Sequence, residues 1–260
     1  MTYERITLDI ANSVATLTLN HPETRNALSW KMASEMGHAL DNLGDARALV
    51  ITGAGKGFCS GGDMSSEVRE GSDFGEMLYE GLTEAVNPML LKLKALKIPV
   101  IAAVNGAAAG AGAPLALLAD FVIAGASAFF FMAFPNVGLV PDSGGSFTLP
   151  RLIGKARAMR MMLLAEKIPA QQAFEWGMIH EVVSDEQLLA EAHALAARLA
   201  AGPTVSYGLI RQQVQEAMET DLATVLQAEA VNQRTAGKSK DCAEAVAAFL
   251  EKRAPAFRGE

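Results

Sequence analysis

Cysteine and basic charge are both scarce in this chain of 260 residues. The two cysteines, Cys59 and Cys242, lie far apart and fit neither a metal-binding motif nor a disulfide framework. The 22 basic residues are outnumbered by 29 acidic ones, and the formal net charge is −7. We therefore do not expect a nucleic-acid-binding surface, and an anionic ligand would need a local basic patch.

Long apolar runs are also missing. The longest, around residues 113–119, falls far short of the roughly 20 residues that a membrane span needs. The first ten residues, MTYERITLDI, carry acidic residues where a signal peptide would have a basic start and an apolar block. We expect a cytoplasmic protein with no membrane partner, and its 50% hydrophobic residues are ample for a core.

Recognisable metal, nucleophile and phosphate motifs are absent as well. The GKG of residues 55–57 lacks the full spacing of a phosphate-binding loop. The histidines fit no nucleophile or metal pattern, so no metal site is expected and we interpret them as surface or structural residues. They are His21, His38, His180 and His193.

The stretch that stands out is residues 98–120, IPVIAAVNGAAAGAGAPLALLAD. Pro99 opens a β-branched run that predicts a buried strand, and Asn105-Gly106 ends it before seven residues that are all Gly or Ala. A helix is expected from about Leu115, with the preceding glycines near its N-terminus, where free N–H groups favour negative charge. Composition alone favours a plainer interpretation, tight packing of the helix on the strand.

A second turn of this kind lies upstream. Residues 48–53 (ALVITG) predict another buried strand, which runs into AGKGFCSGGDM with Gly57, Gly61 and Gly62 ahead of Asp63. If the two strands are parallel neighbours, N–H groups of both loops could converge on one oxygen, as in an oxyanion hole.

Three segments, GKGFCSGGDM, IPVIAAVNGAAAGAGAPLAL and FPNVGLVPDSGG, resemble in order and spacing the signatures of the enoyl-CoA hydratase/isomerase (crotonase) superfamily. The resemblance spans essentially the whole chain and is greatest to the 2-(1,2-epoxy-1,2-dihydrophenyl)acetyl-CoA isomerases of phenylacetate catabolism. It implies an α/β fold, a crotonase-like spiral of ββα turns with a C-terminal helical region. It also implies an acyl-CoA thioester whose carbonyl oxygen is held by the N–H groups of Gly62 and Ala111. No cofactor is implied, because CoA is part of the substrate.

The resemblance also bears on the chemistry. Family hydratases use two glutamates, and the matching positions here are Pro114 and Asn136, neither of which can take up a proton. Asp142 stands where several isomerases of the family carry an aspartate, so we expect it to act as the acid/base. The alternative is that Asp142 only caps a helix or fixes a turn, a role for which Ser143 competes.

An acyl-CoA isomerase that shifts a double bond or rearranges a ring epoxide, in phenylacetate or fatty-acid catabolism, is therefore the leading hypothesis. The alternatives are an enoyl-CoA hydratase of atypical mechanism and an inactive acyl-CoA-binding protein. The physiological acyl group stays open.

Further substrate-binding residues are implied by the resemblance. Arg25 and Ala27 lie in a loop that borders the CoA nucleotide in the family, and Lys252 could meet the CoA phosphates, also across a subunit boundary. We interpret Asp63 as fixing the turn that presents Gly62, and Met77, Leu78, Leu82 and Met89 as core or acyl-pocket wall. The other candidates are Ser60, Gly61, Met64, Gly110, Pro114, Asn136, Val137 and Leu139, of which Val137 and Leu139 would, with Phe134, raise the pKa of Asp142.

The remaining pattern is read as an α/β region followed by helices, with a boundary near Gly202. Residues 1–202 would form the spiral with the acyl-CoA site, and residues 203–260 a helical oligomerisation region of a homotrimer or dimer of trimers. Met159, Met161, Met162 and Leu163 are candidates for the contact. Strands are expected at 3–10, 14–19, 121–124, 128–131 and 178–183, and helices at 30–43, 76–94, 145–152, 155–165, 169–177, 187–201, 204–218, 222–236 and 241–252.

Overall fold

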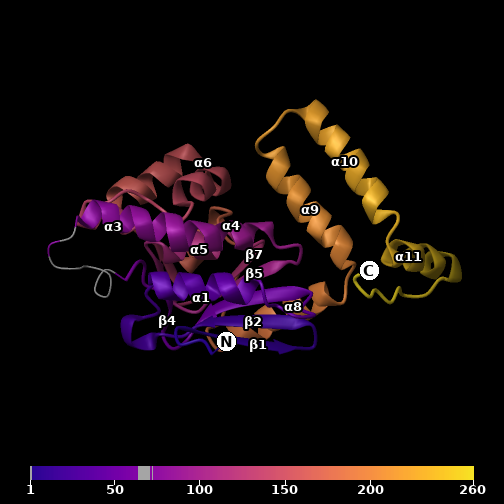
Figure 1. Cartoon of the computed structure of the whole chain (residues 1–260), viewed down its shortest axis with the longest axis horizontal. Helices are drawn as coiled ribbons and strands as arrows, with labels where there is room; N and C mark the ends of the chain where they lie inside the picture. Colours follow the sequence, from indigo (N-terminus) through magenta and orange to yellow (C-terminus); the bar gives the residue numbers. More distant parts are fainter. Residues whose placement is uncertain (1, 64–70, 72) are drawn as a thin grey trace.

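The computed structural model describes residues 2–63, 71 and 73–260. An α/β core occupies one side of the molecule, and an arm of helices projects from it (Figure 1). The larger sheet of the core has the strand order β1-β2-β3-β5-β7-β10, and every pair in it except β1–β2 is parallel. Its strands are β1 (Ile6–Ala11), β2 (Val14–Leu19), β3 (Ala48–Gly53), β5 (Val100–Val104), β7 (Phe121–Gly125) and β10 (Glu181–Val183).

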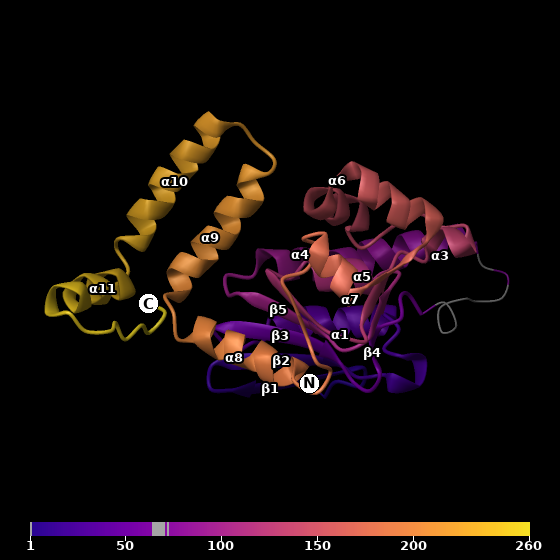
Figure 2. The ribbon, with the colours of Figure 1, turned by 180° about the vertical axis from the view of Figure 1, so that it is seen from behind.

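The large sheet is buried on both faces. All six residues of β3 are buried, with Leu49 and Ile51 in one hydrophobic cluster and Ala48 and Val50 in another. Helix α1 covers one face and α8 covers the other (Figures 1 and 2). Helices on both faces explain why the parallel strands read as continuous apolar runs rather than alternating ones.

A second sheet, with the order β4-β6-β8-β9, lies beside the first. Each of β3, β5 and β7 passes into a strand of this sheet before a helix follows, which gives the predicted spiral of ββα turns. The passages are tight: a Cβ on Gly53 would lie 2.2 Å from the Gly57 oxygen, and one on Gly106 would lie 2.3 Å from the Lys56 oxygen. The strands are β4 (Gly57–Cys59), β6 (Ala107–Ala109), β8 (Phe129–Phe131) and β9 (Lys167–Pro169).

Strands β4, β6 and β9 were not predicted. The prediction treated residues 107–113 as a turn because Gly and Ala have little strand propensity. Residues Ala107–Ala109 are nevertheless extended, because they pair in parallel with β4 on one side and with β8 on the other. Tertiary pairing, rather than local sequence, forms this strand.

The helix expected at 76–94 is three consecutive pieces. Helix α3 (Phe74–Gly81) is capped by the Asp73 side chain, and a π-helical turn, η2 (Leu82–Val86), joins it to α4 (Asn87–Ala95). Pro88 has no N–H for the regular ladder, which accounts for the irregular turn just before it.

The other core helices follow the sequence more closely. Ser29 caps α1 (Trp30–Leu40) by accepting from the Met32 N–H at 3.2 Å, although α1 ends earlier than predicted. Gly154, with φ 75° and ψ 160°, breaks α6 (Gly145–Leu164) into the two helices that were expected. The remaining elements are η1 (Pro22–Thr24), α5 (Gly112–Leu117), η3 (Phe134–Val137), α7 (Ala170–Glu175) and α8 (Leu188–Ala200). Within the described ranges, no helix is long and apolar enough to cross a lipid bilayer.

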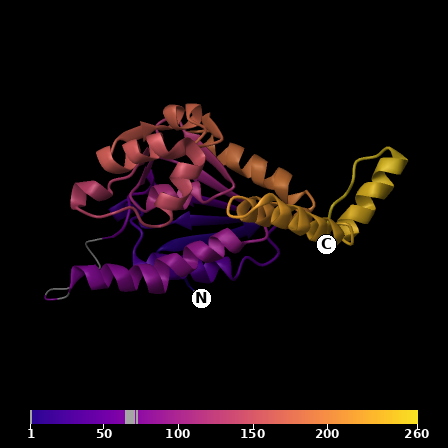
Figure 3. The same ribbon diagram turned by 90° about the horizontal axis from the view of Figure 1, so that it is seen from above.

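Three further helices form the arm, α9 (Thr204–Ala217), α10 (Leu222–Ala236) and α11 (Lys240–Glu251). The arm extends away from the sheets in all three views (Figures 1 to 3). Polar contacts join it to the core: Arg47 Nε donates to Thr204 Oγ1 at 2.8 Å, and Arg211 Nε donates to Asp120 Oδ2 at 2.6 Å. The division of the chain at residue 202 into two functional regions stays a prediction.

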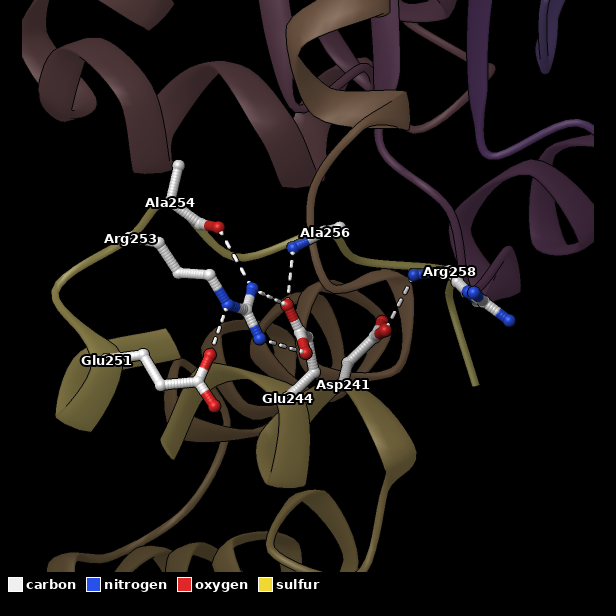
Figure 4. A network of polar contacts seen from close by, with 7 residues as sticks. All are labelled: Asp241, Glu244, Glu251, Arg253, Ala254, Ala256 and Arg258. Carbon is white, nitrogen blue, oxygen red and sulfur yellow. Dashed lines mark hydrogen bonds and ion pairs between the residues drawn. The ribbon is translucent and has the colours of Figure 1, made fainter. Parts of the chain in front are cut away.

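The C-terminal tail folds back on α11 through ion pairs and backbone contacts (Figure 4). Arg253 donates to both oxygens of Glu244, at 2.6 and 3.0 Å, and to Glu251 at 2.6 Å. The buried Asp241 accepts from the N–H groups of Arg258 and Gly259, at 2.7 and 2.8 Å.

Candidate active site

The two glycine loops meet back to back. A Cβ on Gly110 would lie 3.2 Å from Gly61 Cα, and one on Gly61 would lie 3.3 Å from the Ala109 oxygen. Both glycines have positive φ, +111° at Gly61 and +49° at Gly110, so a side chain at either would be strained as well as crowded. The residues that follow, Gly62 and Ala111, therefore lie side by side.

Backbone pairing orients the N–H of Gly62. Leu28 donates its N–H to the Gly61 oxygen at 2.7 Å and accepts from the Asp63 N–H at 3.2 Å, an isolated parallel bridge opposite Gly62. These bonds use the neighbours of Gly62, so its own N–H points away from Leu28. No described residue accepts that N–H, and Gly62 lines a cavity.

Ala111 presents its N–H from the second loop. The Gly110 N–H donates to the Phe131 oxygen at 2.8 Å, which fixes the loop against β8. Ala111 directly precedes α5, where the first N–H groups of a helix have no intrahelical acceptor. Its N–H has no acceptor among the described residues, and Ala111 lines the same cavity as Gly62.

Asp142 lines this cavity too. Burial raises the pKa of its carboxyl group, and a hydrogen bond from Ser143 Oγ, at 2.9 Å, acts in the opposite direction. Asp142 does not cap α6, because that helix begins at Gly145 after Gly144, with no side-chain cap bond. The cavity thus contains a half-buried carboxyl group of raised pKa and two N–H groups without described acceptors.

The apolar part of the cavity comes from α1, α3 and η2. Met77, Leu78 and Leu82 line it and Met89 is buried in the core, and the prediction of core or pocket wall allowed both places. Trp30 and Phe74, which also line it, were not predicted to. Trp30 begins the capped helix α1 two residues after the Leu28 bridge, a tertiary contact that the sequence does not reveal.

Several predicted site residues lie outside this lining. Val137 is 55% exposed, and Leu139 is half-buried against the core, so the apolar surroundings of Asp142 come from other side chains. Asn136 is exposed on η3, and Pro114 is buried in α5, with its Cγ 3.1 Å from where a Cβ on Gly145 would lie. Their roles in substrate binding stay predictions.

The loop expected to border CoA is joined to the first glycine loop. The Ser60 N–H donates to the Arg25 oxygen at 3.1 Å, and Ser60 Oγ donates to the Thr24 oxygen at 2.8 Å. Asn26, which was not predicted as a site residue, is fully buried and donates through Nδ2 to the Ala54 and Gly57 oxygens at 2.9 and 2.8 Å. Arg25 is exposed beside this joint, whereas Ala27 is buried.

Two candidates are not at the cavity. Met64 lies outside the described residues. Lys252 ends α11, at the opposite end of the molecule from α3 (Figure 1), so it could reach only the site of another copy.

No group of His, Cys, Asp or Glu within the described ranges could hold a metal ion. His180 Nδ1 instead accepts from the Val122 N–H at 3.0 Å, and burial lowers the pKa of this imidazole.

The family model described as "Enoyl-CoA hydratase/isomerase" matches residues 9–260. The chain belongs to this family. Its expected crotonase-like fold is therefore confirmed by the sequence match as well as by the observed spiral.

Relatives in the family carry different activities. The 1,2-epoxyphenylacetyl-CoA isomerase of Escherichia coli is 45% identical over 260 residues, 99% of each chain. A "Probable enoyl-CoA hydratase" of Rhodobacter capsulatus is also 45% identical, over all of both chains. The crystal structure of an enoyl-CoA hydratase from Bacillus anthracis matches with a TM-score of 0.92 and 32% identity, over 99% of this chain and 100% of that one. Membership of the enoyl-CoA hydratase/isomerase family thus establishes an enzyme family that acts on acyl-CoA thioesters without selecting one reaction.

Proposed function

We propose that the protein is an acyl-CoA isomerase that shifts a double bond or rearranges a ring epoxide. The observation that carries this proposal is the meeting of Gly62, Ala111 and Asp142 at one cavity. Two preorganised N–H groups suit an enolate oxygen, and removal of one such donor typically costs about 10²–10³ in rate. Similarity to the Escherichia coli 1,2-epoxyphenylacetyl-CoA isomerase supports the ring epoxide. Participation in phenylacetate or fatty-acid catabolism stays a prediction.

The proton balance needs only one carboxyl group. Ionised Asp142 removes a proton from the carbon next to the unsaturation, and the electron pair moves to the thioester oxygen held by Gly62 and Ala111. The protonated carboxyl group then returns the proton to a different carbon, and the double bond has moved. With an epoxide, ionised Asp142 removes a proton from the carbon next to the thioester, and the electron pair of that C–H bond forms a double bond as the adjacent epoxide C–O bond breaks. The carboxyl group then gives its proton to the released oxygen, so the product is an isomer. No metal or redox cofactor enters these steps.

Water addition is the second candidate, for one reason. Asp63 lines the same cavity as Asp142, although Pro114 and Asn136 replace the family's glutamates. A pair of carboxyl groups could deliver the elements of water to a double bond. The named hydratases among the relatives are compatible with this candidate.

Mass spectrometry of products separates the candidates. The purified protein would be given a 3-enoyl-CoA, a 2-enoyl-CoA and 1,2-epoxyphenylacetyl-CoA. We expect the double bond to move or the epoxide to rearrange, with no gain of 18 mass units from water. Efficient hydration that needs both Asp63 and Asp142 would favour the second candidate, and binding of all three esters without turnover would leave an acyl-CoA-binding protein.

We also propose that the chain works as a homotrimer or dimer of trimers, with residues 203–260 at the contact. Exposed apolar side chains on the arm support this assembly, including Leu222 at 72% exposure and Phe249 at 81%. Of the methionines expected at the contact on α6, Met161 is buried within its own chain and cannot take part.

A further inference from the structure

The cavity is lined by two kinds of group. Gly62, Ala111 and Asp142 are the groups of the chemistry proposed above, and Trp30 and residues of α3 and η2 add apolar lining. The residues that limit the acyl group must therefore be sought among the apolar ones.

Trp30 rests directly on Gly81, the last residue of α3. A Cβ on Gly81 would lie 1.9 Å from Trp30 Cε2 and Nε1, and 2.5 Å from Cζ2, far inside any real contact. The backbone of Gly81, at φ −61° and ψ −39°, is ordinary α-helix, a conformation that glycine disfavours relative to alanine. Conformational freedom does not explain this glycine, but the space that it leaves for the indole does.

The π turn begins at the next residue. The Asn87 N–H donates to the Leu82 oxygen, five residues back, in place of the usual four. Leu78, Leu82 and Val86, spaced four apart, lie on one face of this segment, and all three line the cavity. The apolar wall is thus built from the segment on which the indole rests.

We infer that the contact between Trp30 and Gly81 determines acyl specificity, by holding the indole as the end wall of the cavity. A second aromatic side chain, Phe74, lines the same cavity, so a flat six-membered ring near the thioester would meet aromatic partners. A longer linear acyl chain would have to displace the indole. The inference rests on the proposed function only in placing the acyl group in this cavity.

Binding of unreactive CoA esters tests the pair without relying on turnover. Calorimetry would compare acetyl-CoA, phenylacetyl-CoA and octanoyl-CoA on four variants: Gly81→Ala, Trp30→Leu, the double variant, and Gly37→Ala. Gly37 is the matched control, because it is also a buried helical glycine, but a Cβ there would lie at an ordinary 3.7 Å from Met89 Cβ.

We expect Gly81→Ala to weaken binding of phenylacetyl-CoA at least tenfold, while the affinity for acetyl-CoA, whose acyl group is a single methyl group, changes less than twofold. Trp30→Leu should raise the affinity for octanoyl-CoA relative to phenylacetyl-CoA at least tenfold. In the double variant the added methyl group should have no further effect, because the atoms it would meet are gone. Gly37→Ala should bind all three esters as the wild type does.

Equal weakening of acetyl-CoA and phenylacetyl-CoA by Gly81→Ala would overturn the inference, as would an alanine effect that persists without Trp30. If Gly81→Ala does not fold, Trp30→Leu alone still decides, since an unchanged ratio of octanoyl-CoA to phenylacetyl-CoA affinity excludes an end wall. A wild-type protein that shows this selectivity but turns over no ester would contradict the proposed function and leave the specificity pair standing.

Discussion

The core and the arm treat apolar side chains in opposite ways. In the core, whole strands such as β3 and β5 are buried. The groups that we propose to act in catalysis there are two backbone N–H groups and the Asp142 carboxyl group, all at the cavity. In the arm, the buried residues of α9 and α10 are polar, Arg211 and Asn232, while apolar side chains face outward. The exposed apolar residues of the arm are Ile210, Val214, Met218, Leu222, Leu226, Val231, Val246, Phe249 and Leu250.

This contrast supports the proposed assembly, because the core buries whole strands within one chain whereas apolar side chains of the arm are exposed in a single copy. Buried polar groups must be paired, and Arg211 is paired with Asp120 of the core. Exposed apolar surface on this scale marks a binding surface, which for the arm we propose to be further copies of the chain. Changes in the core should therefore affect catalysis or folding of the single chain, and changes on the outer face of the arm should affect assembly.

The largest expected effect is on the core's carboxyl group. Asp142→Asn keeps the shape but cannot exchange a proton, so turnover should fall by about 10²–10⁴ while the melting temperature stays near that of the wild type. Because burial raises the pKa of Asp142, the acid limb of the wild-type rate profile should lie above the ordinary value of 3.8. Steady-state kinetics against pH measure both effects.

Ser143→Ala is the control for Asp142→Asn. It keeps the carboxyl group and removes the hydrogen bond that lowers the pKa of Asp142, so the acid limb should move to higher pH with little loss at its plateau. A fully active Asp142→Asn enzyme would contradict the proposed mechanism.

The next prediction concerns the Arg211–Asp120 ion pair, which joins the core to the arm. Arg211→Met removes the buried cation of a pair whose Asp120 side chain is 23% exposed, so the cost should lie at the lower end for a buried pair, about 3 kcal/mol of unfolding free energy. Arg160→Met is the matched control, because the Arg160–Glu166 pair has the same 2.6 Å separation but is exposed, and it should cost less than about 1 kcal/mol. Urea denaturation measures both, and equal losses would show that Arg211 does not hold the arm.

Substitutions in the glycine loops should have the next largest effect, a loss of kcat. Gly110→Ala would press a methyl group against Gly61 Cα at 3.2 Å and displace the Ala111 N–H, so we expect a loss of about 10²–10³ in kcat. Gly177→Ala has comparable backbone strain, at φ +72°, but meets nothing within 4 Å and lies outside the cavity. Its kcat should stay near that of the wild type, and a similar loss in both variants would mean that strain rather than the N–H position matters.

Assembly through the arm should respond to a smaller change. Phe249→Ser removes an outward side chain, so the single chain should fold as before, while dissociation of the oligomer should become roughly 30-fold easier. Phe174→Ser, on α7 of the core, is the control and should leave assembly unchanged. Sedimentation over a range of concentrations decides, and a wild-type chain that is monomeric at micromolar concentration would contradict the proposed assembly.

Elements that are determined by nearby residues could be predicted from the sequence, and elements that depend on distant contacts could not. The helices of the arm were predicted to within about two residues, because their caps and apolar periodicity are local signals. The two glycine loops were located from their glycines, whereas their role as an oxyanion hole came from the resemblance and stays a prediction. Strand β6 could not be predicted, since Ala107–Ala109 is extended only through its neighbours. Trp30 could not be placed in the cavity, because its contact with Gly81 joins residues fifty positions apart in the chain.

The smallest expected effect concerns the tail of the arm. Hydrogen bonds from Arg253 and from the Ala256 N–H lower the pKa of the Glu244 carboxyl group from 4.5 to about 2. The folded pKa is thus below the unfolded one, so this group stabilises the docked tail above pH 4.5 and loses that contribution as the pH falls towards 2.

The chemical shift of the Ala256 amide, 2.9 Å from Glu244 Oε1, should report the ionisation of Glu244. Between pH 6 and about 3.5 the wild-type signal should stay nearly constant, while Arg253→Gln should bring a transition close to 4.5. Arg258→Gln is the control, since Arg258 reaches Glu244 only through weak long-range attraction, and its signal should follow the wild type. A wild-type transition near 4.5 would mean that the tail is not held by Glu244 and that the arm ends in a free segment.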